Sequence, residues 1–485
     1  MTLYYQYNLK IKTKMFKLRV AAVKKLKLKL WQWTIPMAGL VAIYLSGCGI
    51  QTQSERQARS DAKTLAGTYR PGDRKVTLPV LDSNATLATF LTYAMLNQPR
   101  VEAAYYEYAA QVERITLARS LPDPRLSFVM DITNVISAIV PGLMIDIPWP
   151  GKLIIGADVA SAVSRVRYYD YENAVLLTAF EVKRPYYQLY FLGERIRLNR
   201  KMLNLMNEVE EIARAQYESG KVTLQDVLRT QIKQARLKND IANLEDSRNP
   251  LMSKLKTALG MAPGQPNPPM PSRLEPTKLD MSSDQLFTIA MAQNPRLKAM
   301  EAEVRAAEEG IKLARQSQYP DFSVGVAADV KAVPMMWLPK LDVTLPVWLD
   351  KIAAEIAAAQ AGKEAASAKF TAEQLKLAVE FADKSFMYRE ASRNLKLFDE
   401  GLLAKAHLSL YVALSAYSSG RIDFINLLEA ESVLLDFQLA EVDARLQIEM
   451  ALAELSLIIG LRQPGEPIPG TTAQISTEGK KSNEH

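Results

Sequence analysis

Two kinds of hydrophobic pattern alternate along this chain. Apolar residues recur every three or four positions in four stretches, which predicts helices over 87–120, 152–217, 285–317 and 351–418. Apolar and polar residues alternate in four shorter segments, at 126–132, 143–148, 322–329 and 337–345. A period of two with one apolar face and a length near ten residues is typical of outer-membrane strands, although an amphipathic hairpin on a soluble core gives the same pattern. Four strands alone leave edges that lipid does not tolerate, so strands in a membrane would require several chains to close a barrel.

The longest predicted helices exceed those of ordinary globular domains. At 1.5 Å per residue the stretch 152–217 would extend about 100 Å. Pro185 lies inside it, where the later stretch has Ser385, so we expect a kink or a break there. Both tracts end at a glycine, Gly220 or Gly420, suited to a helix C-cap with positive φ. A return helix follows, with apolar positions in steps of three and four at Leu435, Leu439, Val442, Leu446, Met450, Ala453 and Leu457. Each tract therefore forms a helical hairpin.

Short landmarks recur in the same order about 200 residues apart. The pairs are 97–100 with 293–296, 115–119 with 311–315, Pro124 with Pro320, 147–148 with 345–346, 217–222 with 417–422, and 259–260 with 459–460. Their spacing drifts only from 196 to 200 residues, which predicts two homologous halves, at 85–261 and 283–461. The proline-rich segment 262–282 is expected to be an extended connector, and the polar tail 462–485 is expected to be disordered.

The basic excess of the chain is confined to its beginning. The formal net charge is +7, but residues 1–47 hold nine lysines and arginines and no acid, leaving 51 basic against 53 acidic residues in 48–485. A basic surface for nucleic acid is therefore not supported. With 48% hydrophobic and 23% charged residues, the composition is that of a folded chain with a sizeable core.

An apolar run at 31–45 follows the lysine-rich flank. Its fifteen or so residues are too few for a spanning helix, which needs about twenty, but suit the core of a signal peptide. The run ends at Leu45-Ser46-Gly47-Cys48, which resembles the bacterial lipobox. The resemblance implies that 1–47 are a lipoprotein signal peptide and that Cys48 is lipidated at the start of an anchor segment, 48–84. The alternative is a lone buried cysteine after an ordinary signal.

The chain holds little material for catalysis or for a metal site. Cys48 is the only cysteine, His407 and His485 are the only histidines, and no glycine-rich phosphate loop is present. His407 has no second histidine or cysteine near it in the sequence, so it is not expected to be a ligand. The soft donors Met335-Met336 stand beside Trp337 in a predicted strand hairpin, where they would face lipid or a loop. We therefore expect no enzyme activity, no cofactor and no metal centre.

A strand hairpin, a long helix, a Tyr-x-x-Gly turn and a return helix occur twice behind the lipobox. This order resembles the TolC-like outer-membrane efflux proteins and covers nearly all of 85–461. Within it, 147–153, 186–190 and 215–220 (IPWPGKL, YYQLY and AQYESG) resemble the subgroup of heavy-metal efflux components. The resemblance implies a mainly α protein with a membrane β-barrel portion. It would be a lipid-anchored homotrimer, with twelve strands in an outer-membrane barrel and twelve helices in an α-barrel tunnel across the periplasm.

The resemblance also implies a role for the two hairpin turns. They would form the periplasmic tip, where such channels meet a membrane-fusion adaptor linked to an inner-membrane pump. The candidate contact residues are Gly220, Lys221, Val222, Gly420, Arg421 and Ile422, of which the two apolar ones suit the hairpin core equally well. Asp226, Asp423 and Glu429 are candidates for an acidic gate, because carboxylates near the tips of three chains would form a ring. The same acids could equally be ordinary solvent-exposed residues on helix surfaces. At a position where family members often carry an acid, this chain has Asn426.

Sequence and resemblance together predict the exit duct of a tripartite efflux pump. A passive duct needs no catalytic cluster, and it would carry exported substrate from periplasm to exterior, with metal cations as one candidate cargo. The expected partners are two further copies, the adaptor, the pump and outer-membrane lipid. The alternative is a periplasmic adaptor or scaffold lipoprotein with coiled-coil hairpins. Adaptors carry one hairpin flanked by soluble β domains, whereas this chain has two hairpins and two pairs of strands.

Overall fold

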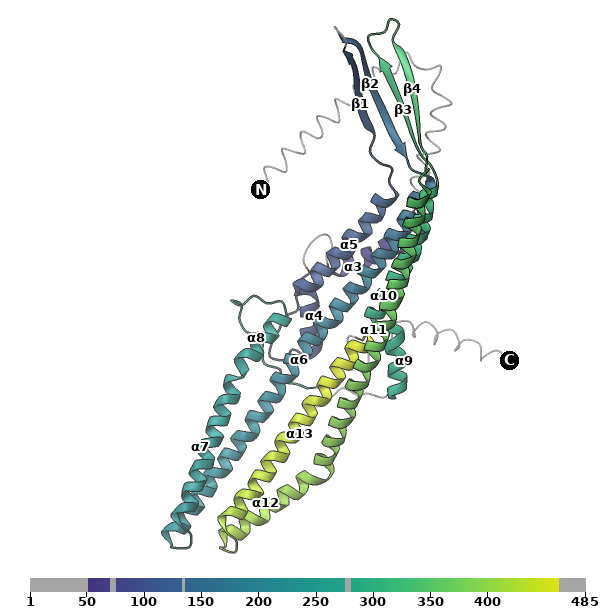
Figure 1. The fold of residues 1–485 in the computed structure, drawn as a ribbon. Coiled ribbons are helices and arrows are strands. Elements are labelled where there is room, and N and C mark those ends of the chain that lie inside the picture. Colours follow the sequence, from purple (N-terminus) through teal and green to yellow (C-terminus); the bar gives the residue numbers. More distant parts are fainter. Residues whose placement is uncertain (1–50, 70–75, 133–135, 275–280, 462–485) are drawn as a thin grey trace, which may run out of the picture.

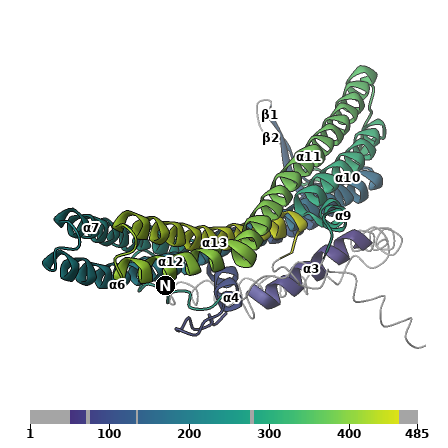
Figure 2. The ribbon, with the colours of Figure 1, turned by 90° about the horizontal axis from the view of Figure 1, so that it is seen from below.

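The computed structural model describes residues 51–69, 76–132, 136–274 and 281–461. Cys48, the signal peptide predicted at 1–47 and the tail predicted at 462–485 lie outside the described residues. Figure 1 shows a sheet at one end of an elongated molecule and the turns of two helical hairpins at the other. Seen from below, the two hairpins lie next to each other, and the helices nearer the sheet extend away from them at an angle (Figure 2).

The four strands form a single antiparallel sheet in the order β1-β2-β3-β4. Their bounds are Arg125–Ile132 for β1, Ile136–Ile147 for β2, Asp321–Asp329 for β3 and Met336–Thr344 for β4. The strand pairs of the two halves join where β2 pairs with β3, from Gly142 opposite Ala327 to Ile147 opposite Phe322. In the part of the chain that the structure describes, β1 and β4 each have one neighbour, so both edges of the sheet are unpaired.

The two faces of the sheet differ in polarity, as the alternating pattern predicts. Residues paired across strands share a face, and one such row runs from Leu126 through Leu143 to Val326. Leu126 is 66% exposed, and its neighbours on this face are also exposed. The other face carries Asp146, which accepts hydrogen bonds from Arg125 and from Ser323 at 2.6 and 2.7 Å. The sheet therefore has an outward apolar surface and an opposite polar surface.

The two halves have corresponding helices, and α3 (Gln53–Tyr69) precedes the first half without a counterpart among the described helices of the second. The first half contains α4 (Leu87–Asn97), α5 (Pro99–Arg119), α6 (Pro150–Glu218), α7 (Leu224–Asp246) and α8 (Arg248–Ala258). The second contains α9 (Ser283–Gln293), α10 (Pro295–Arg315), the 3-10 turn η2 (Gln316–Gln318), α11 (Leu349–Leu397), the π segment η3 (Phe398–Leu402), α12 (Leu403–Ser418) and α13 (Phe424–Ile459). Near the sheet, neighbours follow the order α5, α6, α10, α11. Near the turns the order is α7, α6, α13, α12.

The helix predicted over 87–120 is two helices, and so is the one predicted over 285–317. Gln98 separates α4 from α5 with φ −72° and ψ 119°, and Asn294 separates α9 from α10 in the same way. A proline follows each of them, at 99 and 295, and proline disfavours helical geometry in the preceding residue. These prolines therefore begin the second helix rather than lying within one long helix.

The break expected at Pro185 is absent, because α6 is continuous through it over 69 residues. The residues around the proline are tightly packed: Tyr186, Tyr187 and Leu189 are buried and belong to the core that contains α4 and α8. This packing holds the helix on both sides of the missing N–H group. The interruption lies instead in the other long tract, at η3, which contains no proline.

The recurring landmarks meet in space. Gly260 ends the first return tract with φ +70°, and the Asn97 side-chain amide donates to the carbonyls of Leu259 and Gly260 at 2.9 and 3.0 Å. In the second half Asn294 donates to the Ile458 carbonyl at 2.8 Å, next to Gly460. In each half, a side-chain amide before the second helix thus donates hydrogen bonds to carbonyls at the end of the last helix of that half.

Replacing Gly260 by alanine should lower the thermal unfolding midpoint. The added methyl would lie 2.6 Å from the Asn97 carbonyl oxygen in a left-handed backbone, at a cost of about 2 kcal/mol. Gly310→Ala is the matched control, because nothing lies within 4 Å of its added methyl and alanine favours a helix by about 1 kcal/mol. Tryptophan fluorescence at a fixed heating rate should show opposite shifts, and a lowered midpoint in both variants would contradict the packing.

Candidate functional site: the hairpin turns

The two turns at the far end from the sheet have the same backbone geometry. Gly220 and Gly420 both have φ +72°, which confirms the positive φ predicted for them. In the first turn the Lys221 amide donates to the Gln216 carbonyl at 2.9 Å, and the second turn repeats this bond from Arg421 at 2.8 Å. These bonds define a Schellman motif, in which a left-handed residue ends the helix. Glycine adopts that conformation without steric cost, so both helices end at these positions.

The six candidate contact residues divide into exposed and packed groups. Gly220, Lys221, Gly420 and Arg421 are exposed at the ends of the hairpins. Val222 and Ile422 are half-buried against the core of the lower hairpins, which includes Tyr417, Phe424 and Leu427. The two apolar residues therefore help to pack the turns, and the surface offered to a partner consists of backbone, one lysine and one arginine.

The three candidate gate acids lie at different places around the turns. Asp226 is half-buried in the first turn of α7, and Asp423 is exposed at the N-cap position of α13. A carboxylate at either place is favoured by the partial positive charge of a helix N-terminus. Glu429 is exposed further along α13. No contact joins these acids within the described residues of one chain, so a ring of carboxylates would require other copies.

A buried amide joins the two hairpins, and the sequence analysis did not single it out. Gln216 of α6 is 8% exposed and donates from Nε2 to the carbonyls of Tyr417 and Ser418, at 3.0 and 3.3 Å. Tyr417 is buried, whereas its counterpart Tyr217 is 43% exposed. Burial raises the pKa of Tyr417 to about 12, and the charge of Asp226 adds to the effect. The one sequence signal for this asymmetry is that Ala416 stands where the first half has Gln216.

A buried carboxylate forms a second link between the hairpins. Glu431 of α13 is fully buried, and its Oε2 lies 3.1 Å from Nζ of Lys233 on α7. Burial raises the pKa of the Glu431 carboxyl, and the neighbouring Lys233 charge opposes this shift. The ends of the two hairpins are therefore held together by a neutral hydrogen bond near the turns and by an ion pair further in.

The other sequence candidates for metal chemistry lie apart from one another. Nε2 of His407 lies 3.4 Å from Nε2 of Gln438, and Met335 and Met336 are half-exposed beside the start of β4. Among the described residues, no three His, Cys, Asp or Glu side chains are grouped as metal ligands. None of the described helices is both long enough and apolar enough to cross a membrane.

Comparison with known proteins finds a family match for part of this chain. Residues 286–461 match the family described as outer membrane efflux protein. The match covers the second of the two halves of the chain. The family consists of the outer membrane channels of tripartite pumps, which are not enzymes, in agreement with the sequence-based expectation. A comparison with curated protein sequences finds no match.

Solved outer membrane proteins share the fold of this chain over most of its length. VceC of Vibrio cholerae is 16% identical with a TM-score of 0.65, and the match covers 77% of this chain and 96% of VceC. The CmeC channel of Campylobacter jejuni is 13% identical with a TM-score of 0.64, covering 84% and 94%. The open-state MtrE channel of Neisseria gonorrhoeae is 15% identical with a TM-score of 0.64, covering 77% and 89%. At these identities the likeness shows a shared fold.

Replacing Gln216 by alanine should loosen the two turns. The change removes the donor to the carbonyls of Tyr417 and Ser418 between the hairpins and should cost about 1–2 kcal/mol. Hydrogen exchange in the turn residues 217–222 and 417–422 should accelerate by about tenfold. Gln225→Ala is the matched control, since Gln225 is exposed beside the same turn and should leave exchange unchanged. Equal exchange in both variants would contradict the link.

Proposed function

We propose that three copies of this chain form the exit duct of a tripartite efflux pump. The observation that carries the proposal is the four-stranded sheet with an exposed apolar face and two unpaired edges. Its strands alternate in direction, so β4 of one copy would meet β1 of the next in antiparallel orientation. Three copies would supply twelve strands, an even number that suits a closed membrane barrel.

The helical part of the chain also has apolar edges without partners in one copy. Near the turns the outermost helices are α7 and α12. Exposed apolar side chains lie on α7 at Leu224, Leu228 and Ile232, and on α12 at Leu408, Tyr411 and Val412. Apolar residues on opposite edges of one layer are expected to pack against each other between copies. Such contacts would continue the barrel of strands into a tunnel of helices.

Two exposed tryptophans mark a membrane-sized band on the sheet. Trp337 near the start of β4 is 59% exposed, and Trp348 just before α11 is 76% exposed. The eleven residue steps from Trp337 to Trp348 span at most about 36 Å, or about 28 Å at the usual strand tilt near 40°. This matches the apolar height of an outer-membrane barrel, and tryptophan favours both membrane interfaces. Exposed Leu341 and Val343 lie between them.

The finer features of the proposal concern the membrane anchor, the partners and the cargo. We assign lipid anchoring to Cys48 on its lipobox, and adaptor contact to the exposed turn residues Lys221 and Arg421. For cargo, the motifs at 147–153, 186–190 and 215–220 favour heavy-metal efflux.

Each of these motifs also has a structural role. Trp149 stacks on Tyr319 at 5.0 Å, and Lys152 pairs with Asp321 at 2.8 Å where helix meets sheet. The Tyr186 hydroxyl donates to the Arg273 carbonyl at 2.8 Å, and Gln216 joins the turns. Because these side chains hold the fold together, the proposal for cargo rests on the resemblance of the motifs. A scaffold role is less well supported, because an adaptor has no use for an apolar sheet with open edges.

Planar bilayers test the channel and its acidic tip together. The purified mature chain should give discrete ionic steps with a preference for cations. Asp423→Asn and Asp226→Asn should each lower the ratio of cation to anion permeability, by about twofold, since a ring would lose three charges. Asp240→Asn is the matched control, because Asp240 is an exposed acid of α7 far from the turn. A soluble monomer that leaves bilayers silent would contradict the channel.

A further inference from the structure

The N-terminal helix α3 packs against α5 and α6, which form the wall beside it, through few apolar contacts. Its packed face consists of Ala58, Ala62, Leu65 and Ala66, which lie against α5 and α6. A 17-residue helix is marginal by itself in water, and three alanines with one leucine bury little apolar surface. Polar contacts must therefore decide whether α3 stays docked.

Glu55 forms the most buried of these polar contacts. Its side chain is fully buried, with Oε1 at 2.9 Å from Nε of Arg59 and Oε2 at 3.1 Å from Nε of Arg119 on α5. Arg59 continues across the interface, donating to Glu113 at 3.1 Å and to Thr116 at 2.5 Å. Two arginines and two carboxylates thus form a balanced network between α3 and the end of α5 nearest the sheet. Removing the charge of Glu55 would leave the partly buried guanidinium groups of Arg59 and Arg119 without the carboxylate that they share.

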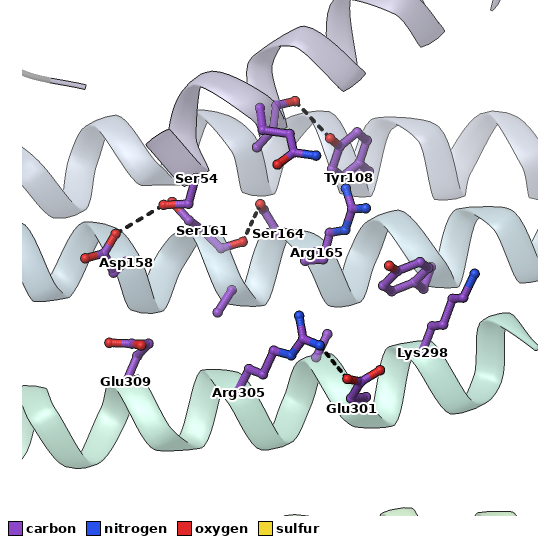
Figure 3. A pocket seen from close by; sticks show the side chains of 15 residues that line it. Ser54, Tyr108, Asp158, Ser161, Ser164, Arg165, Lys298, Glu301, Arg305 and Glu309 are labelled. Carbon is purple, nitrogen blue, oxygen red and sulfur yellow. Dashed lines mark hydrogen bonds and ion pairs between the residues drawn. The ribbon is translucent and has the colours of Figure 1, made fainter. Parts of the chain in front are cut away.

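Further polar contacts fix α3 along its length against α5 and α6. Ser54 donates to Asp158 at 3.1 Å, and Tyr108 donates to the Ala58 carbonyl at 2.9 Å (Figure 3). Arg165 of α6 pairs with Asp61 at 2.8 Å. These contacts border a cavity of about 660 Å³ between α3, α6 and α10. Because the contacts begin near Asp158 and continue to Arg165, α3 descends the wall in the same direction as α6.

The position of α3 along the long axis of the molecule limits where the residues that precede it can lie. Asp158 lies eight helical residues after Pro150, so α3 begins about 12 Å below the junction of helix and sheet. Five residue steps lead from Cys48 to Gln53, and their reach is at most about 17 Å. Residue 48 can therefore reach the height of the junction, where Trp149 lies. If α3 were detached from α5 and α6, the chain from residue 48 to α4 could extend more than about 100 Å. An anchor at residue 48 would then not fix the position of the helices relative to the membrane.

We propose that α3 holds the lipidated N-terminus at Cys48 against α5 and α6, at the inner face of the outer membrane. We call α3 the clasp, and we call the buried ion pairs of Glu55, on which its docking depends, the lock. The membrane end of this proposal rests on the proposed lipid-anchored channel. The docking of α3 depends only on contacts within the chain. The partner of the chain before α3 is a phospholipid surface. Attachment to that surface would fix the position of α5 and α6 relative to the membrane.

Hydrogen exchange of the full mature chain tests the lock. Glu55→Gln should accelerate exchange in residues 53–67 by about tenfold or more. The matched control is Glu113→Gln, the same change in the same network at a side chain that is 72% exposed, with an expected change below about threefold. Asp61→Asn should give an intermediate effect and serves if the Glu55 variant does not fold. Wild-type α3 that exchanges like a free peptide, or equal exchange in the Glu55 and Glu113 variants, would overturn the clasp.

A photo-crosslinking residue in place of Cys48 tests the height. The variant without Cys48 cannot be lipidated, so contact between residue 48 and phospholipid in vesicles depends only on the docking of α3. Crosslinks to lipid are expected with Glu55 present and should fall several-fold with Glu55→Gln. Absence of lipid crosslinks while α3 remains protected would overturn the membrane position but not the docking. Loss of channel conductance with both results intact would count against the proposed duct and not against the clasp.

Discussion

Among the described residues, the outer backbone groups of β1 and β4 are unpaired, and this imposes the main constraint on the protein. In the proposed channel the apolar face of the sheet lies in hydrocarbon, where each unsatisfied N–H or C=O group costs several kcal/mol. Salt bridges such as Arg125 with Asp146 place the polar face away from lipid. A single copy cannot satisfy both faces and both edges at once. Association of several copies is therefore a condition for the sheet to be stable in a membrane, and the arrangement of the helices follows from it.

The far end of the molecule combines two requirements, a sharp reversal of each hairpin and a connection between hairpins. Gly220 and Gly420 provide the reversals with the same geometry. The connection is unequal, because Gln216 has no counterpart in the second half and Glu431 is a buried acid of the second half only. Any widening between the hairpins must break the Gln216 hydrogen bonds and separate Lys233 from Glu431. The turns are thus joined by polar interactions, whose groups water could hydrogen-bond if the hairpins separated.

Local patterns predicted the strands and the reversals well, because each depends on neighbouring residues. Alternation placed β1, β3 and β4 and the second part of β2, which begins at Ile136 rather than at 143, and the glycines marked the turns. Predictions that ignore tertiary packing do less well. Of the kink or break expected at Pro185, the break is absent, because α6 continues through the proline with buried aromatic residues packed after it. The single helices predicted over 87–120 and 285–317 are each two helices, because the prolines at 99 and 295 begin the second one. The candidate site was found through its turns, but Gln216 and Glu431 were missed, since their partners lie on helices distant in sequence.

The number of copies in non-denaturing detergent tests the account most directly. Native mass spectrometry of the mature chain, with its secondary structure checked by circular dichroism, reports that number without assuming a channel. The account predicts trimers, because three copies close the sheet and pair every edge. A folded monomer whose sheet amides at β1 and β4 are protected from exchange would contradict it, because the edges would then be satisfied within one chain.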